Sequence, residues 1–345
     1  MSSPSPLLAA HLKVDPEWLA LRSEPILDPG RTIVDPHHHL WDRAGLSYEA
    51  SELTRDLLSG HKVRGTVFVQ CRTHYRESGP QWLRPVGETE YVVRIAEDID
   101  KAHPLFGACA GIVGHADLNL GAAVEKVVVA HVEAGRGRFR GVRHSSAWDA
   151  NSVVYNPELG AVRYMMRSSR FRDGVARVAS MGLSFDAWVY HPQIPEVTEL
   201  ARACPEATIV LNHVGGPIGV GPYAADRVGV FSEWREAMRE LAGCENVFVK
   251  LGGLAMRISG HTFHEQTMPP NSETLALAWR PFVETSIELF GADRCMFESN
   301  FPVDKASCSF AILWNAFKRL ASVASDEDQD KLLSATAARV YRLKF

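Results

Sequence analysis

Residues 32–42 read TIVDPHHHLWD, a short β-branched run, Thr32–Asp35, that leads directly into three histidines. Little polar alternation within such a run is typical of a strand in a buried parallel sheet. Alternate side chains of a strand point to one side, so His37 and His39 project together while His38 points away. Two imidazoles on one side of a strand end can bind one metal ion or donate two hydrogen bonds to one oxygen atom. Histidines without a chemical role are the alternative.

The same pattern, a short apolar run followed by a longer amphipathic segment, recurs along the rest of the chain, and we expect eight strand–helix units. The predicted strands are Thr32–Asp35, Thr66–Gln70, Phe106–Val113, Phe139–Arg143, Leu183–Trp188, Thr208–Leu211, Val247–Leu251 and Cys295–Glu298. The predicted helices lie at about 51–59, 88–102, 119–134, within 157–181, and at 195–203, 231–242, 272–290, 308–321 and 327–341.

Eight such units in one chain favour an α/β fold of the closed (β/α)8 TIM-barrel type over an open doubly wound sheet. A length of 345 residues fits one such barrel. Residues 1–31 are rich in proline and serine, and we interpret them as an N-terminal extension packed on a single barrel domain at 32–345.

Composition narrows the classes of partner. The chain has 37 Lys and Arg against 41 Asp and Glu, a formal charge of −4, which argues against nucleic acid or an anionic membrane surface as the main partner. No apolar run reaches the 18 or so residues that span a bilayer, and the first residues lack the basic start of a secretory signal. Six scattered cysteines without a C-x-x-C pair are typical of a reduced cytosolic protein. We therefore expect a cytoplasmic protein that acts on a small molecule, with homo-oligomerisation left open.

In a barrel the active site lies at the carboxyl ends of the strands, and each predicted strand brings a polar group to this rim. Besides the strand 1 histidines and His115 near the end of strand 3, these are Gln70, Arg72 and Tyr75 after strand 2, Arg143 and His144 after strand 4, Asp186, Trp188 and His191 at strand 5, His213 after strand 6, Lys250 on strand 7, and Glu298 and Asn300 at strand 8.

Several of these residues have an ordinary structural interpretation as well. His213 can be a structural histidine, although a position across the barrel from His37 and His39 favours function. Arg143 can form an internal ion pair, or it can grip a carboxylate or a developing oxyanion. Lys250 can serve to neutralise a buried carboxylate.

Four stretches carry a family resemblance. They are DPHHHLWD at 35–42, FRGVR at 139–143, VLNHVGG at 210–216 and MFESNFPV at 296–303. Together they resemble the amidohydrolase superfamily, specifically its amidohydrolase-related group of lactonase-type barrels, which includes 2-pyrone-4,6-dicarboxylate lactonase and sugar lactonases. The resemblance covers about residues 32–340.

The resemblance implies roles for the histidines and the arginine. In the lactonase branch, His37, His39 and His213 polarise the lactone carbonyl without requiring a metal ion, whereas decarboxylase relatives use these histidines with others to hold zinc. Arg143 matches part of the clamp on a substrate carboxylate. The resemblance thus implies either no required cofactor or one divalent metal ion, zinc.

One position departs from the family pattern. The strand 8 motif of the family is usually G-S-D-[WY]-P, with the Asp as general base or metal ligand, and here it reads Glu298-Ser299-Asn300-Phe301-Pro302. An amide cannot take a proton from water, so Asn300 cannot act as that base. Glu298, Asp304 and Asp186 are the carboxylates that could replace it.

Three functions follow as hypotheses. The first is hydrolysis of a lactone or related cyclic ester that bears a carboxylate, with water attacking the carbonyl. The second is a zinc-dependent decarboxylase or amide hydrolase, with His191 as an additional candidate ligand. The third, motivated by Asn300, is a barrel that binds a small acid without catalysis. The long segment at 257–271 is a candidate lid over the site.

Overall fold

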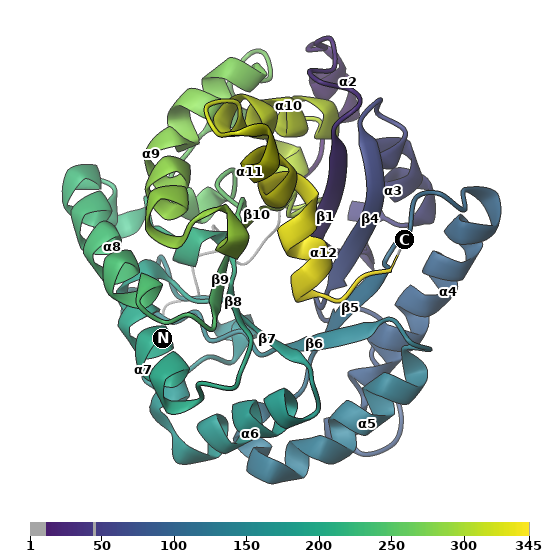
Figure 1. Cartoon of the computed structure of the whole chain (residues 1–345), viewed down its shortest axis with the longest axis vertical. Coiled ribbons are helices and arrows are strands. Elements are labelled where there is room, and N and C mark those ends of the chain that lie inside the picture. Colours follow the sequence, from purple (N-terminus) through teal and green to yellow (C-terminus); the bar gives the residue numbers. More distant parts are fainter. Residues whose placement is uncertain (1–11, 44–45, 345) are drawn as a thin grey trace.

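A computed structural model describes residues 12–43 and 46–344, and it contains a barrel of eight parallel strands surrounded by helices (Figure 1). The strand order is β1-β4-β5-β6-β7-β8-β9-β10, so each strand lies beside the next one along the chain. The (β/α)8 expectation is confirmed. The strands are β1 (Thr32–His38), β4 (Lys62–Val69), β5 (Gly111–Gly114), β6 (Phe139–Arg143), β7 (Ser184–Ala187), β8 (Ile209–Leu211), β9 (Val247–Leu251) and β10 (Cys295–Phe297), and a small antiparallel pair is formed by β2 (Trp41–Arg43) and β3 (Leu46–Tyr48).

The helices cover the outside of the barrel through one apolar face each. Helix α10 (Phe310–Ala321) illustrates the pattern, because it buries Phe310, Leu313 and Phe317 at a spacing of three to four residues. The other α-helices are α2 (Pro16–Ala20), α3 (Ala50–Leu57), α4 (Val86–Ala102), α5 (Glu125–Ala134), α6 (Ser169–Ser180), α7 (Ile194–Ala203), α8 (Arg227–Ala242), α9 (Ser272–Phe290), α11 (Asp326–Asp330) and α12 (Thr336–Val340), the last two joined by a π-helical turn at Lys331–Ala335.

The seam between the first and last strands closes the barrel just where the candidate catalytic residues lie. The backbone N–H of Asn300 donates to the His37 carbonyl at 2.9 Å, and the N–H of His39 donates to the Phe301 carbonyl at 2.7 Å. Relative to β4, β1 contains one extra residue between Asp35 and His38. The backbone that carries His37 and His39 is therefore hydrogen-bonded to the backbone that carries Asn300.

Some predicted element boundaries are wrong for local reasons. The third strand begins at Gly111 instead of Phe106, because Gly107 and Cys109 have positive φ angles (51° and 48°) that no strand accommodates. The helix predicted at 119–134 begins at Glu125, because Gly121 (φ 60°, ψ −140°) interrupts the segment before it.

The described part of the N-terminal segment packs on the barrel. The Trp18 indole N–H donates to the Gln266 carbonyl at 3.0 Å, and Arg22 Nε donates to the Pro269 carbonyl at 3.2 Å. These bonds tie the segment to the loop after β9, which contains the candidate lid at 257–271; movement of that loop stays a prediction. The division into an extension at 1–31 and a barrel at 32–345 also stays a prediction, and residues 1–11 lie outside the described part.

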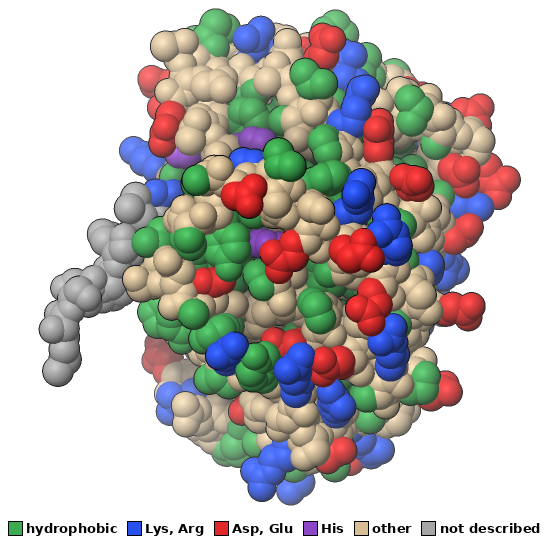
Figure 2. Space-filling model, turned by 90° about the vertical axis from the view of Figure 1, so that its left-hand side faces the viewer, with side chains coloured by type: hydrophobic (Ala, Val, Ile, Leu, Met, Phe, Trp, Pro, Cys, Tyr) green, Lys and Arg blue, Asp and Glu red, His purple; other side chains and the backbone are tan. Residues whose placement is uncertain are grey.

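The surface and the cysteines agree with the composition. All six cysteines are unpaired thiols, five of them buried. On the face formed around α7, α8 and α9, acidic and basic side chains alternate (Figure 2). In the described residues, no helix is both long enough and apolar enough to cross a membrane.

Candidate active site

A buried carboxylate joins two histidines at the floor of the candidate site. Glu298, directly after β10, accepts hydrogen bonds from His213 Nδ1 at 2.6 Å and from the His213 backbone N–H at 3.0 Å. Its other oxygen lies 2.7 Å from His37 Nδ1, and the side chains of all three residues are almost fully buried. Glycines after β9 make room for this cluster: a Cβ atom on Gly252 would lie 2.5 Å from Glu298 Cγ, and one on Gly253 would lie 2.4 Å from His213 Nδ1.

These bonds determine which ring nitrogen carries the proton. A carboxylate only accepts, so Nδ1 of His213 donates to Glu298 and Nε2 keeps its lone pair. His213 is one of the residues that line the pocket described below. Burial lowers the pKa of His213, although Glu298 opposes this, so the neutral imidazole is favoured. His39 Nδ1 likewise donates to the Val69 carbonyl at 2.7 Å. An imidazole in this state accepts a proton and is suited to act as a base.

Two cations flank His37. Arg143 Nη1 lies 3.3 Å from His37 Nε2, while its Nη2 donates to the Gln70 carbonyl. Lys250 Nζ lies 3.4 Å from His37 Nδ1. Burial, followed by the charge of Lys250, lowers the pKa of His37 well below its ordinary value. The site therefore combines one carboxylate with a fixed positive charge at the Arg143 side.

Asp186 lies below this floor and is saturated with hydrogen-bond donors. It accepts from Lys250 Nζ at 2.7 Å, from Asn212 Nδ2 at 3.1 Å, and from the Tyr341 hydroxyl at 2.8 and 3.0 Å. Lys250 therefore neutralises a buried carboxylate, as the ordinary structural interpretation expected. Because its oxygens are occupied in this way, Asp186 is poorly placed to take a proton from water.

Asn300 and Asp304 form a pair at the wall of the site. Asn300 Nδ2 donates to Asp304 Oδ1 at 2.9 Å, and the Ala255 backbone N–H donates to Asp304 Oδ2 at 3.1 Å. Burial raises the pKa of Asp304 to about 8. Asn300 lines the pocket and Asp304 lies behind it. Asp304 thus holds the Asn300 amide in one orientation, with Oδ1 left as its acceptor.

A pocket of about 170 Å³ opens above this floor, at the carboxyl ends of the strands. Trp188 forms one wall and packs edge-on against His213, with ring centroids 4.7 Å apart. Seven of the sequence-predicted site residues line the pocket: His39, Gln70, Arg72, Arg143, Trp188, His213 and Asn300.

Eight predicted site residues do not line it. His37, Asp186, Lys250, Glu298 and Asp304 belong to the buried layer described above. The other three point elsewhere: the Tyr75 hydroxyl is buried without a hydrogen-bond partner in the described structure, His144 Nδ1 accepts from the Leu118 N–H at 3.2 Å, and His191 Nδ1 accepts from the Ile218 N–H at 3.3 Å.

Two features of the site were not predicted from the sequence. Trp41 stacks on His39 with centroids 5.7 Å apart, and Arg43 lies over Trp41; both line the pocket. The tryptophan in the stretch DPHHHLWD could have indicated Trp41. The second feature is Tyr341, whose hydroxyl donates to Asp186, and no local sequence pattern indicates this contact because the two residues are far apart in the chain.

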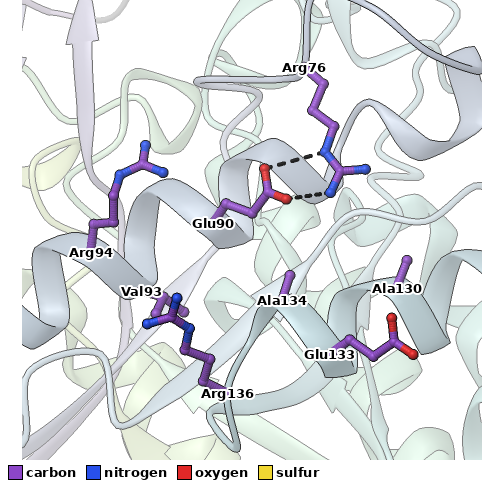
Figure 3. A pocket seen from close by; sticks show the side chains of 8 residues that line it. All are labelled: Arg76, Glu90, Val93, Arg94, Ala130, Glu133, Ala134 and Arg136. Atoms are coloured by element: carbon purple, nitrogen blue, oxygen red, sulfur yellow. Dashed lines mark hydrogen bonds and ion pairs between the residues drawn. The ribbon is translucent and has the colours of Figure 1, made fainter.

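A larger hollow of about 600 Å³ lies outside the barrel, between α4 and α5 (Figure 3). Its Arg76 is bound to Glu90, as the dashed lines show, and Arg136 pairs with Glu97 at 2.8 Å. It contains none of the strand-end residues. The smaller pocket with the buried histidines is therefore the candidate active site.

Comparison with known proteins identifies the family. A family model described as amidohydrolase matches residues 34–343. The chain belongs to this amidohydrolase family. The uncharacterised protein y4mH of Sinorhizobium fredii is 32% identical to it in an alignment of 332 positions that covers 90% of this chain and 98% of that protein. An L-fucono-1,5-lactonase of Burkholderia multivorans is 25% identical in an alignment of 336 positions that covers 91% of this chain and 97% of that protein.

A solved amidohydrolase from Burkholderia multivorans with bound zinc shares the fold of this amidohydrolase. The TM-score is 0.70 at 23% identity, over 91% of this chain and 100% of that one. The family match and the lactonase relative together confirm that the protein is a hydrolase, and they confirm the family resemblance.

The buried cluster of this amidohydrolase has the residue types of a metal site. His37, His213 and Glu298 each offer a ligand atom, and these atoms lie within 4.8 Å of one another. Nitrogen and carboxylate ligands are those that zinc prefers, so the three residues fit a divalent cation. The nearby charges of Lys250 and Arg143 oppose a dication at this position.

Proposed function

We propose that this amidohydrolase hydrolyses a lactone that bears a carboxylate. The observation that carries the proposal is the bond of His213 Nδ1 to Glu298, which leaves Nε2 as the proton acceptor of a histidine that lines the pocket. The relationship to an L-fucono-1,5-lactonase supports a cyclic ester as the substrate class.

In the proposed reaction, His213 Nε2 takes a proton from water as the water oxygen bonds to the lactone carbonyl carbon. Glu298 stabilises the imidazolium that forms, in the manner of the aspartate in a serine protease triad. The ring C–O bond then breaks, and the imidazolium returns its proton to the leaving alkoxide. Water has been added across the ester bond, and the base is neutral again.

Arg143 is the positive group that we assign to the substrate. Its guanidinium lies 3.3 Å from His37 Nε2 and Arg143 lines the pocket, so it can hold the substrate carboxylate or stabilise the oxyanion. Asn300 Oδ1, oriented by Asp304, accepts a hydrogen bond from the attacking water or from a substrate hydroxyl. In this scheme Asn300 orients and His213 takes the proton, which accounts for a site without the family aspartate.

If a divalent cation binds, His37, His213 and Glu298 would hold it, and it would polarise the carbonyl as a Lewis acid. The same three residues favour the second candidate, a zinc-dependent decarboxylase or amide hydrolase. A substrate panel separates the candidates: carboxylated lactones, neutral lactones, aromatic acids and amides.

The test is turnover of this panel by the wild-type protein and by His213→Asn. We expect hydrolysis of a carboxylated lactone and a loss of roughly 100-fold or more in kcat for the variant, because a positioned general base contributes about 10²–10⁴-fold. His144→Asn is a matched control, since His144 is buried and bonded to Leu118 away from the pocket. Lactone turnover that survives intact in His213→Asn would contradict the proposed base.

A further inference from the structure

A second pocket lies at the opposite end of the barrel from the catalytic residues. It is about 580 Å³ in volume and is formed where β4, β5 and β6 begin, next to the end of α4. Arg64 comes from β4, Arg138 and Arg140 from the start of β6, and Lys344 from the segment after α12. In Figure 1 the segment that follows α12 accordingly runs past β5 toward α4.

The charges around this pocket are unbalanced. Four cationic side chains and one carboxylate, Asp100, line it, an excess of three positive charges. Asp100 pairs with Arg138 at 2.7 Å, and no ion pair of Arg64, Arg140 or Lys344 is found among residues 12–43 and 46–344. The hollow in Figure 3 differs, because its Arg76 is already paired with a carboxylate.

Arg140 shows the imbalance most directly. Its Nε is buried without a hydrogen-bond partner in the described structure, and Arg342 Nη2 donates to the Arg140 carbonyl at 2.9 Å, which brings a fifth cation to the pocket edge. Burial, then Arg342 and Arg138, lower the pKa of Arg140. A buried guanidinium nitrogen without an acceptor is unfavourable unless an acceptor is supplied.

We propose that this pocket binds a small molecule with two phosphoryl groups. Each phosphoryl group carries about −1.5 to −2 charges at neutral pH, so two of them match the excess of positive charge. Guanidinium groups bind phosphoryl oxygens through paired hydrogen bonds, and a hollow of about 580 Å³ has room for a small anion of this kind. The site is separate from the proposed lactonase pocket, because it lies where the strands begin and shares no lining residue with the pocket at their carboxyl ends.

The experiment is calorimetric titration of the full chain with inorganic pyrophosphate at constant ionic strength. We expect saturable binding that weakens about ten-fold or more in Arg64→Gln and in Lys344→Gln, equivalent to one lost charged contact. Arg170→Gln and Lys126→Gln are matched controls, since both residues are exposed and lie outside this pocket; they should retain the wild-type affinity. Ala110→Asp keeps every arginine but adds a carboxylate to the wall, so it should abolish binding while Ala110→Asn preserves it.

Other anions test the chemistry of the ligand. Orthophosphate should bind more weakly than pyrophosphate, and citrate should not match it. Absence of pyrophosphate binding, equal losses in the control variants, or tighter binding of citrate or orthophosphate would each overturn the proposal. Lactone turnover by the same variants should stay at the wild-type level, so a failure here is distinguishable from a failure of the proposed catalytic reaction.

Discussion

Replacing Glu298 with glutamine tests the proposed catalytic dyad most directly. The glutamine side chain keeps the size of Glu298 but loses the charge and offers one acceptor oxygen in place of two. It can accept from His213 Nδ1 or lie with its oxygen toward His37, but it cannot do both. Where the amide NH2 faces His213, the imidazole has to accept at Nδ1, which moves its proton to Nε2 and removes the base.

The size of the effect follows from the contact with His213 Nδ1. A hydrogen bond to a charged group contributes about 1.5–3 kcal/mol, so losing this bond to the imidazolium costs about 1.5–3 kcal/mol. At about 1.4 kcal/mol per factor of ten, kcat should fall roughly 10–10²-fold. Because the His213 backbone N–H also donates to Glu298, a small loss of stability is expected alongside it.

The assay is steady-state hydrolysis of the lactone that the wild-type protein turns over best, with thermal unfolding measured on the same preparations. Glu196→Gln serves as control, because Glu196 is also buried but lies on α7 outside the pocket. A folded Glu298→Gln protein that retained more than about a tenth of the wild-type kcat would refute the role of Glu298, since a positioned base contributes about 10² or more.

Four other perturbations have defined outcomes. Arg143→Lys should raise KM about ten-fold or more for a carboxylated lactone and less for a neutral one, because a lysine cannot reproduce the forked guanidinium contacts; equal changes for both substrates would contradict a carboxylate clamp. Tyr341→Phe should lower the free energy of unfolding by about 1–3 kcal/mol in urea titrations, since it leaves buried Asp186 with one donor fewer; an unchanged midpoint would argue against this. Burial lowers the pKa of His131 to about 4, so between about pH 6.5 and 4 the unfolded chain binds a proton that the folded chain does not. As the pH is lowered through this window, the free energy of unfolding of the wild type relative to His131→Gln should fall by about 1.4 kcal/mol per pH unit. A pH-independent difference would be inconsistent with a neutral buried imidazole. If His37, His213 and Glu298 hold zinc, as the second candidate function requires, zinc added to chelator-treated protein should raise the melting temperature of the wild type but not that of His37→Asn; equal shifts in both would place the ion elsewhere.

The sequence predicts the barrel well where the periodicity is strong. The predicted strands Phe139–Arg143 and Val247–Leu251 and the helix at 272–290 agree with the structure at both ends, because apolar runs and clear polar flanks define them. The predicted start of the third strand is wrong because Cys109, a residue with positive φ, excludes a strand there without any change in the hydrophobicity of the sequence.

The sequence predicts which polar residues lie near the carboxyl ends of the strands, but it does not predict which partners they bond. Parity along a strand predicts that His37 and His39 lie together and that Glu298 lies one layer below Asn300. In the structure the rings of His37 and His39 have centroids 5.0 Å apart, and Glu298 is fully buried while Asn300 lines the pocket. Which partner each polar group selects depends on distances across the barrel. The pairing of Asp186 with Tyr341 joins residues 155 positions apart, so no local pattern could reveal it.

The seam between β10 and β1 has a consequence for how the protein acquires activity. The N–H of Asn300 and the carbonyl of His37, like the N–H of His39 and the carbonyl of Phe301, come from segments more than 250 residues apart in the chain. Joining them requires the largest loop in the barrel to close, and contacts of such long sequence separation form slowly. A compact intermediate in which the other seven strand pairs have formed would bring His213 and Glu298 together, but it would still hold His37 and His39 apart from Glu298 and Asn300. Recovery of turnover during refolding would then report the final joining step, later than the recovery of helical signal.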